Sequence, residues 1–242
     1  MTVEEVAAPT VRDKIKGMLP QSGDAVLEVV LHADALDGDH FMLPAFRRYL
    51  AGLGIDQELE RTFYAGGLCF LELDAPVQLA EQIATFAPVR ALREMPKLRI
   101  LRPAVRTSGI VSEPIELPTD AALDPSLKVA IFDGGIPDQH PITVWTTPVA
   151  QGVGRGHPDL ARHGLGVTSA FLFGHLTPGV TAPRPFANVD HYRVLDLDPS
   201  QNKYELYEVL ARIDHVLATT PYDFINLSIG PELAIQDDDV HA

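Results

Sequence analysis

The sequence predicts an α/β protein made of two modules, a small mixed module followed by part of a larger module with a parallel sheet. Three observations lead to this prediction. Before residue 102, apolar runs of strand length alternate with helical patterns in the order β-α-β-β-α-β. Four prolines then fall between Pro103 and Pro125, which indicates an extended connector. Beyond them, apolar strands alternate with helices, as in a parallel sheet that is covered on both faces.

The first module is expected over residues 23–102, after a polar lead-in at 1–22. An apolar run at 25–31 predicts a strand, and leucines and a phenylalanine at helical spacing from Leu43 predict a helix that ends at Gly54. Strands at 62–64 and 68–73 flank Gly66-Gly67, which suggests a bulge or a hairpin tip. A second amphipathic helix and two short strands complete the pattern; they are expected around residues 79–86, 89–92 and 98–101. This order suggests a ferredoxin-like α+β sandwich.

The second module is expected over residues 127–242, after a Pro-rich linker at 103–126. Its predicted elements are strands at 127–132, 189–195 and 224–229 and helices at 163–173 and 206–217. The helix at 163–173 has the composition of a buried helix and ends at Gly174. The last strand is apolar on both faces, and no helix pattern follows that could cover one of them. We therefore expect these residues to form only the front half of a larger domain.

Composition excludes several functional classes. A net charge of −14 argues against nucleic acid or an anionic membrane surface as a partner, because both require basic patches. The single cysteine, Cys69, lies in an apolar run and is expected to be a buried thiol, so disulfides within the chain and multi-thiolate metal sites are excluded. No apolar stretch is long enough to span a bilayer, and the N-terminus lacks the features of a signal peptide. A cytoplasmic location is expected.

The most informative residues are Asp133 and His163. Asp133 ends an apolar strand and is followed by Gly134-Gly135, while His163 is followed by glycine and then by small and apolar residues. We expect His163 at the start of a helix. A carboxylate at a strand end and a histidine on the next helix can together orient and tune an imidazole for general-base work.

These motifs resemble those of the subtilases, the subtilisin-like serine peptidases. The run Val129-Ala-Ile-Phe-Asp133-Gly-Gly135 is similar to the aspartate motif of that family, and His163-Gly164-x-x-Val167-x-Ser169-Ala170 is similar to its histidine motif. Residues 192–196 resemble the strand that follows, and residues 225–230 resemble the strand that lines the substrate cleft. The order of the acid before the histidine also agrees with the subtilisin-type triad.

The resemblance implies a catalytic role for Asp133 and His163, and pairing of Ser228, Ile229 and Gly230 with the substrate backbone. It also implies that the first module is a propeptide. The substrate would be a peptide or protein, and neither a cofactor nor a metal ion is expected.

The chain departs from the family pattern in three respects. Gly134 stands where the family usually has Ser or Thr, and Leu165 where it usually has Thr. The Gly-Thr-Ser nucleophile motif of the family lies further along, and Ser169 and Ser228 are no substitutes for it. The nucleophile would come from a C-terminal half or a complementing chain, and residues 1–242 alone are expected to be inactive. The alternative is an inactive peptide-binding or regulatory module on the same fold.

Other sites are weaker hypotheses. Asp133, His140, His157 and His163 could be drawn into a zinc ligand set, but their spacing is not that of a helical metal motif. Residues 237–239 could bind calcium loosely, although a solvated acidic run is favoured. The glycine-rich residues 152–156 lack the Lys-Ser/Thr of a phosphate loop, and no helix start of the required kind is expected after them. Asn226 is expected to be structural and to bond neighbouring backbone.

Overall fold

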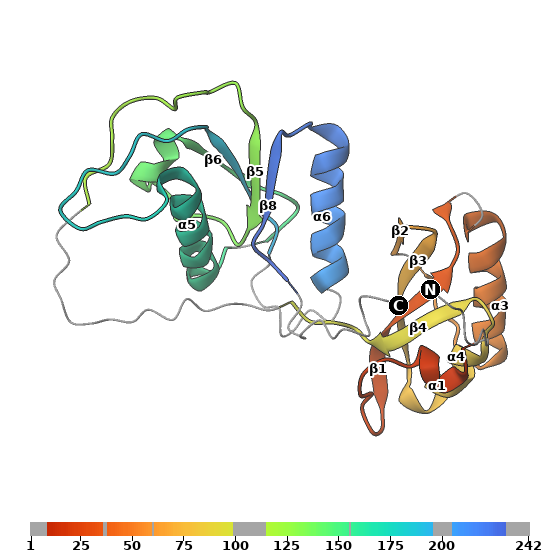
Figure 1. Cartoon of the computed structure of the whole chain (residues 1–242). Coiled ribbons are helices and arrows are strands. Elements are labelled where there is room, and N and C mark those ends of the chain that lie inside the picture. The colour runs from red at the N-terminus through yellow and green to blue at the C-terminus, as the bar shows by residue number, and fades with distance from the viewer. Residues whose placement is uncertain are drawn as a thin grey trace, which may run out of the picture. The chain divides into compact units, whose positions relative to one another are not determined.

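The computed structural model describes residues 9–35, 38–59, 61–98, 115–154, 156–195 and 205–230. It is a mixed α/β structure with one antiparallel and one parallel sheet (Figure 1). The contacts divide the chain into two compact units, of which the first holds residues 1–96 and the second residues 97–234. None of the helices within the described ranges has the length and apolar character needed to cross a membrane.

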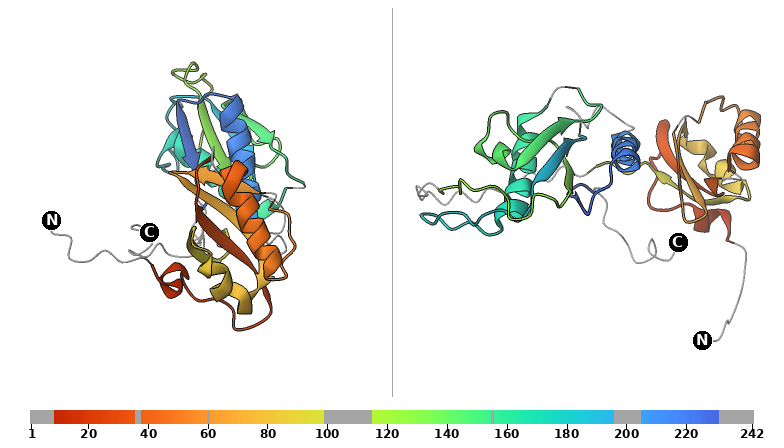
Figure 2. Two further views of the ribbon diagram at one scale, coloured as in Figure 1. Left: turned by 90° about the vertical axis from the view of Figure 1, so that its right-hand side faces the viewer. Right: turned by 90° about the horizontal axis from the view of Figure 1, so that it is seen from above.

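Unit 1 contains a four-stranded sheet in the order β2-β3-β1-β4, and every neighbouring pair is antiparallel. Its strands are β1 Asp24–His32, β2 Thr62–Ala65, β3 Leu68–Pro76 and β4 Val89–Glu94. Its main helical segments are η1 Gly38–Met42, α3 Leu43–Gly52, η2 Val77–Leu79 and α4 Ala80–Thr85. The helices α3 and α4 pack on the same face of the sheet (Figures 1 and 2).

The core of unit 1 follows from alternation along the central strands. Leu27, Val29 and Leu31 of β1 are fully buried and belong to one apolar cluster with Phe46 and Leu50 of α3. The elements β1, α3, β2, β3, α4 and β4 follow one another in the predicted β-α-β-β-α-β order.

The tip of the β2–β3 hairpin is formed by Gly66 and Gly67, which have φ of 59° and 77°. A two-residue turn of this kind needs positive φ at both positions.

Two parts of the first prediction differ from the structure. Leu98 packs in the core of unit 2 and not in unit 1, while the rest of the short strand expected at 98–101 lies outside the described residues. The segment expected to be a polar lead-in includes helix α1 Val11–Lys14, capped by Thr10. Its last residue, Lys14, is only 6% exposed, and its ammonium donates to the carbonyl oxygens of Ala84, Phe86 and Ala87 at the end of α4.

This buried lysine gives a stability prediction for unit 1. Replacing Lys14 by methionine keeps the apolar stem and leaves three carbonyl groups without their charged donor, which we expect to cost about 2–3 kcal/mol of unfolding free energy. Lys16→Met, two residues further on, is the matched control and should change it by less than about 0.5 kcal/mol. Chemical denaturation checks both variants, and equal effects would show that the Lys14 contacts contribute nothing.

Unit 2 contains a four-stranded sheet in the order β6-β7-β5-β8, and all neighbouring pairs are parallel. Its strands are β5 Val129–Asp133, β6 Thr146–Ala150, β7 Val189–Arg193 and β8 Phe224–Leu227. Its helices are η3 Pro141–Val144, α5 Pro158–Phe173 and α6 Glu205–Thr219. Helices α5 and α6 lie on opposite faces of the sheet (Figures 1 and 2).

The central strand β5 is buried on both faces, as expected for a parallel sheet. Val129 and Ile131 face a cluster that includes Leu172 of α5, whereas Ala130 and Phe132 face a cluster with residues of α6. The described part of the expected linker, residues 115–126, packs onto unit 2. Ala122 is buried there, and the carbonyl oxygen of Asp120 accepts a hydrogen bond from the indole of Trp145.

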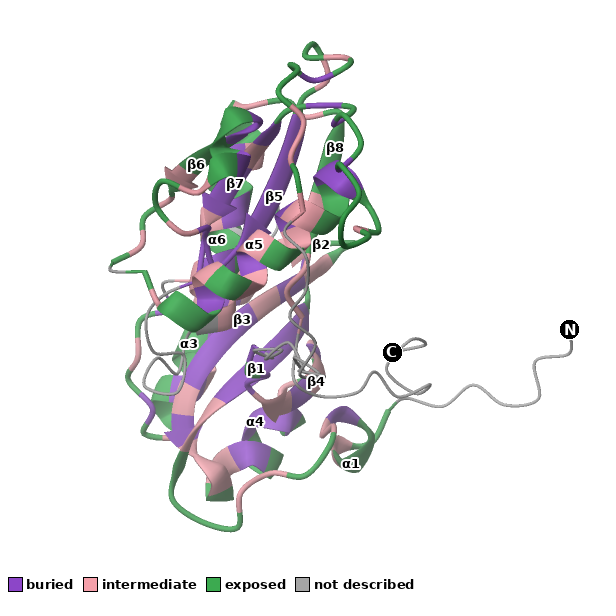
Figure 3. Cartoon of the chain, turned by 90° about the vertical axis from the view of Figure 1, so that its left-hand side faces the viewer, coloured by how far each residue is buried: buried purple, intermediate pink, exposed green. Residues whose placement is uncertain are grey.

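Strand β8 differs from β5 in its burial, as the colouring in Figure 3 shows. It lies at one end of the strand order, and Phe224, Ile225 and Leu227 are 57%, 46% and 54% exposed. The outer edge and much of the apolar surface of β8 are therefore uncovered among the described residues.

Candidate active site

Asp133 is the last residue of β5, at the carboxyl edge of the parallel sheet. This edge is where open α/β sheets carry their ligand sites, because the loops to the following helices leave there. The Asp133 side chain is completely buried. Its Oδ1 atom lies 2.9 Å from Nδ1 of His163 and also accepts a hydrogen bond from the backbone N–H of Gly134. The structure therefore brings the two residues of the predicted pair together.

Two opposing effects determine the pKa of Asp133. Burial raises the pKa of this carboxyl above its usual value, because the ionised form loses its hydration. The hydrogen bonds from His163 and Gly134 oppose this shift but do not cancel it. The second carboxyl oxygen, Oδ2, is buried and has no hydrogen-bond partner among the described residues. One of the two carboxyl oxygens of Asp133 therefore has no hydrogen-bond donor among the described residues.

His163 lies in the second turn of α5 and not at the start of the helix, so this part of the prediction is wrong. The helix begins at Pro158, because proline is favoured at the first helical position and the side chain of His157 accepts from the N–H of Asp159. The helix is also not fully buried. Leu160, Gly164, Thr168 and Leu172, four residues apart, form the buried stripe, while the opposite side is exposed. The His163 side chain is 19% exposed, so its second nitrogen can be reached from outside.

Close packing of two glycines fixes the distance between α5 and the end of β5. A methyl group on Gly164 would collide with the carbonyl oxygen of Gly135, and a methyl group on Gly134 would collide with the side chain of Leu160. Without these glycines the helix could not approach closely enough for His163 to reach Asp133. The same contact explains why residue 134 carries no hydroxyl, because no side chain fits between the turn and the helix.

The predicted substrate-binding residues Ser228, Ile229 and Gly230 follow β8. Leu227 pairs with Phe132 in register, so this segment leaves the sheet at the same edge as Asp133. The hydroxyl of Ser228 donates to Oδ1 of Asn226 at 2.6 Å. The amide of Asn226 was expected to bond neighbouring backbone, but this hydrogen bond is to a side chain. Among the described residues, Asp133 is the sole side-chain hydrogen-bond partner of the His163 ring, and neither Ser169 nor Ser228 contacts it.

The structure also bears on the zinc, calcium and phosphate-loop hypotheses. His140 and His157 each cap a helix through Nδ1, and no group of three potential ligands that could hold a metal occurs in the described part of the chain. The structure therefore does not bring these residues together as a zinc ligand set. Residues 237–239 lie outside the described residues. Helix α5 begins at Pro158, shortly after the glycine-rich residues. Pro158 has no N–H and the N–H of Asp159 is bonded by His157, so this is not the helix start that a phosphate loop requires.

Sequence reasoning missed His191 and Thr168. His191 is the middle residue of β7 and is completely buried; its Nδ1 lies 2.8 Å from the hydroxyl of Thr168 on α5. Burial lowers the pKa of His191 to about 4, so the ring is neutral at physiological pH. Its Nε2 atom is buried and has no partner in the described ranges. The alternation along Val189–Arg193 places His191 on the same face as buried Val189, and this was the sequence signal that could have identified it.

His191 predicts an acid-sensitive unit 2. The unfolded chain binds a proton near pH 6.5, whereas the folded chain does not until about pH 4. Stability is therefore fully present above pH 6.5 and is lost as the pH falls toward 4, by at most about 3 kcal/mol. His191→Asn should flatten this dependence, although it also lowers stability at neutral pH. Denaturation curves at several pH values measure it, and an unchanged slope in the variant would contradict the assignment.

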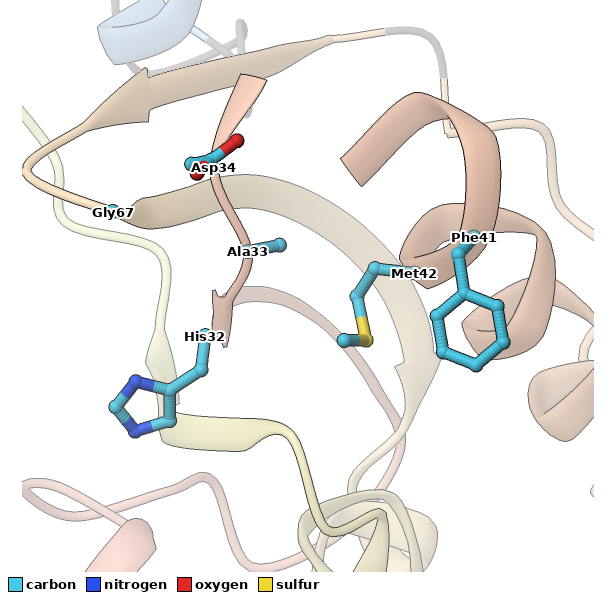
Figure 4. Close-up of a pocket in the computed structure, with 6 residues that line it drawn as sticks. All are labelled: His32, Ala33, Asp34, Phe41, Met42 and Gly67. Carbon is cyan, nitrogen blue, oxygen red and sulfur yellow. The ribbon is translucent and has the colours of Figure 1, made fainter. Parts of the chain in front are cut away.

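A pocket in unit 1 is lined by residues at the end of β1, in η1 and in the β2–β3 turn, namely His32, Ala33, Asp34, Phe41, Met42 and Gly67 (Figure 4). The pKa of His32 is lowered, first by burial and then by Arg90 and Lys14. None of the predicted site residues lines this pocket, because all of them lie in unit 2.

Comparison of the sequence with protein-family models and with curated proteins found no match to either.

Proposed function

We propose that this chain is the N-terminal part of a subtilisin-like serine endopeptidase and carries the acid and base of its triad. The observation that carries the proposal is the hydrogen bond between buried Asp133 and partly exposed His163 at the carboxyl edge of a parallel sheet. The acid bonds Nδ1, so Nε2 is left for a nucleophile, and this is the arrangement that triad chemistry needs.

In the proposed reaction, Nε2 of His163 takes the proton of a serine hydroxyl while the serine oxygen attacks the peptide carbonyl carbon. His163 then returns the proton to the leaving amine, and the acyl-enzyme is hydrolysed by water along the same route. Asp133 holds the imidazole in the Nδ1–H tautomer and stabilises its positive form. The serine would come from a segment beyond residue 242 or from a complementing chain, and residues 1–242 alone would not hydrolyse peptides.

Two further features support the proposal. The backbone of Ser228–Gly230 leaves the sheet beside Asp133, so a substrate strand paired with it would pass the catalytic edge. In unit 1, the order β2-β3-β1-β4 with both main helices on one face supports a ferredoxin-like sandwich, the fold that a subtilase propeptide would have.

A second candidate function is an inactive peptide-binding or regulatory module. The edge of β8 favours it, because within the described ranges its backbone groups on that side have no strand partner, and such groups flanked by Phe224, Ile225 and Leu227 are a template for strand addition. Such a module would bind an extended peptide or protein segment without cleaving it.

Peptide hydrolysis separates the two functions. Residues 1–242 and a version extended along the reading frame are incubated with a mixed peptide library, and cleavage is followed by mass spectrometry. The protease proposal expects cleavage only by the extended or complemented protein. Peptide binding without cleavage in every form supports the module and contradicts the protease.

A further inference from the structure

Two buried polar atoms beneath helix α5 lack hydrogen-bond partners among the described residues. One is Oδ2 of Asp133, and the other is Nε2 of His191. An unsatisfied buried polar group costs about 1–3 kcal/mol, so two of them in one small region call for a physical explanation. The residue after Asp133 is a glycine packed against Leu160, so its side chain cannot supply a donor to Oδ2.

The two atoms have complementary hydrogen-bonding roles. The ring of His191 is buried and neutral, so only one of its nitrogens carries a proton. When the hydroxyl of Thr168 donates to Nδ1, the proton must lie on Nε2. Nε2–H is then a buried donor without an acceptor, and Oδ2 of Asp133 is a buried acceptor without a donor.

The sheet register places these side chains close together. β5 and β7 are parallel neighbours in which Ile131 pairs with His191, so Asp133 lies two residues further along the adjacent strand. Both side chains point toward α5, because Asp133 bonds His163 and His191 bonds Thr168. Diagonal neighbours on one face of a sheet are about 7–8 Å apart at their backbones, a gap that two side chains can nearly close.

Gly164 shows how closely helix α5 packs over the side chains of Asp133 and His191. The point that a methyl group on Gly164 would occupy is 3.0 Å from Cε1 of His191 and closer still to the carbonyl oxygen of Gly135. The His191 ring therefore lies directly under the helix turn that carries His163, next to the Asp133–Gly135 turn. A buried donor and a buried acceptor in this position can be satisfied together by a single water, which needs two or more polar partners.

We infer that one buried water accepts a hydrogen bond from Nε2–H of His191 and donates one to Oδ2 of Asp133. His191 is thereby a positioning residue for the Asp133–His163 pair, and this role rests on the proposed function. The linked chain runs from Thr168 through His191 and the water to Asp133 and then to His163. It stabilises the ionised carboxylate that must hold the imidazole, in a pocket where burial otherwise disfavours that charge.

Two variants of His191 test this inference with a readout that general destabilisation would not reproduce. The Asn side chain of His191→Asn can still accept from Thr168 but is too short to reach the water, whereas His191→Gln places an amide N–H near the position of Nε2. The pKa of Asp133, followed by carboxyl carbon NMR, should rise in His191→Asn and return toward the native value in His191→Gln. Tyr222→Phe changes the hydrogen bond to Asp190 on the α6 side of the same sheet and is the control that should not move it.

An equal pKa of Asp133 in the native protein and in His191→Asn would overturn the inference, as would equal shifts in the Asn and Gln variants. If His191→Asn does not fold, two measurements on the native protein still test the inference. A high-resolution crystal structure should contain one water within hydrogen-bonding distance of both atoms, and nitrogen NMR should find the Nε2–H tautomer of His191. The Nδ1–H tautomer, or a site without that water, would contradict it. None of these measurements needs a nucleophile, so their failure is distinct from failure of the protease proposal.

Discussion

Replacing Gly164 by alanine is expected to break the Asp133–His163 hydrogen bond and to destabilise unit 2 by at least about 3 kcal/mol. The added methyl group would collide with the carbonyl oxygen of Gly135, which is backbone and cannot rotate aside, and would press on the ring of His191. The helix must then move away from the end of β5, and it takes His163 with it. Chemical denaturation measures the loss of stability, and the hydrogen-bonded Nδ1 proton of His163 reports on the pair.

Gly166→Ala is the matched control for this prediction. It lies two residues further along the same helix, and a methyl group there would meet nothing within 4 Å. Because alanine is the better helix former, this variant should stabilise unit 2 by up to about 1 kcal/mol. The test is whether the change in unfolding free energy has opposite signs for the two alanine variants of this helix. Equal and small effects at both would mean that the helix does not depend on the contact between Gly164 and Gly135.

In the proposed peptidase, replacing Asp133 by asparagine is expected to lower kcat by about 10⁴-fold, because asparagine holds the imidazole in the wrong tautomer and cannot stabilise its positive form. Asp190→Asn is the control, since Asp190 lies one strand away and accepts from the hydroxyl of Tyr222 on the other face of the sheet. It should leave kcat within a few-fold of the native value. Similar losses in both variants would indicate a general effect of charge on the sheet.

The same Asp133 substitution should stabilise unit 2 as the pH rises. Burial raises the pKa of Asp133, so as the pH rises above 3.8 the unfolded chain ionises this group before the folded chain does. The native protein therefore loses stability between pH 3.8 and the folded-state pKa and keeps that cost at higher pH, whereas below 3.8 the cost is absent. The gain of the asparagine variant over the native protein should therefore appear as the pH rises above 3.8 and level off above the folded-state pKa. A gain that is largest in acid would contradict this sign.

The sequence predicted the parts of the fold whose cause is local. Apolar runs and helical spacing identified β1, α3, β5 and α6, and the motif around Asp133 located the carboxylate at the end of its strand. Strand β6 was missed because Thr146–Ala150 contains Pro148, which is unfavourable inside a sheet but tolerated in a strand at its edge.

Other features depend on contacts between distant residues and could not be predicted. His163 looked like a helix start because the following residues are small and apolar, whereas the helix begins earlier through Pro158 and the His157 cap. The roles of Gly134 and Gly164 arise only where α5 crosses the end of β5. His191 is separated from Thr168 by the end of α5 and a loop, so its place beneath the predicted pair became clear only from the sheet register.

Fluorophosphonate labelling of the complete or complemented protein, followed by peptide mapping, tests the central claim most directly. The proposal expects one labelled serine outside residues 1–242, and loss of labelling when His163 is replaced by alanine. Labelling of a serine within residues 1–242, or labelling that is unaffected by the His163 substitution, would show that this histidine does not serve a serine nucleophile.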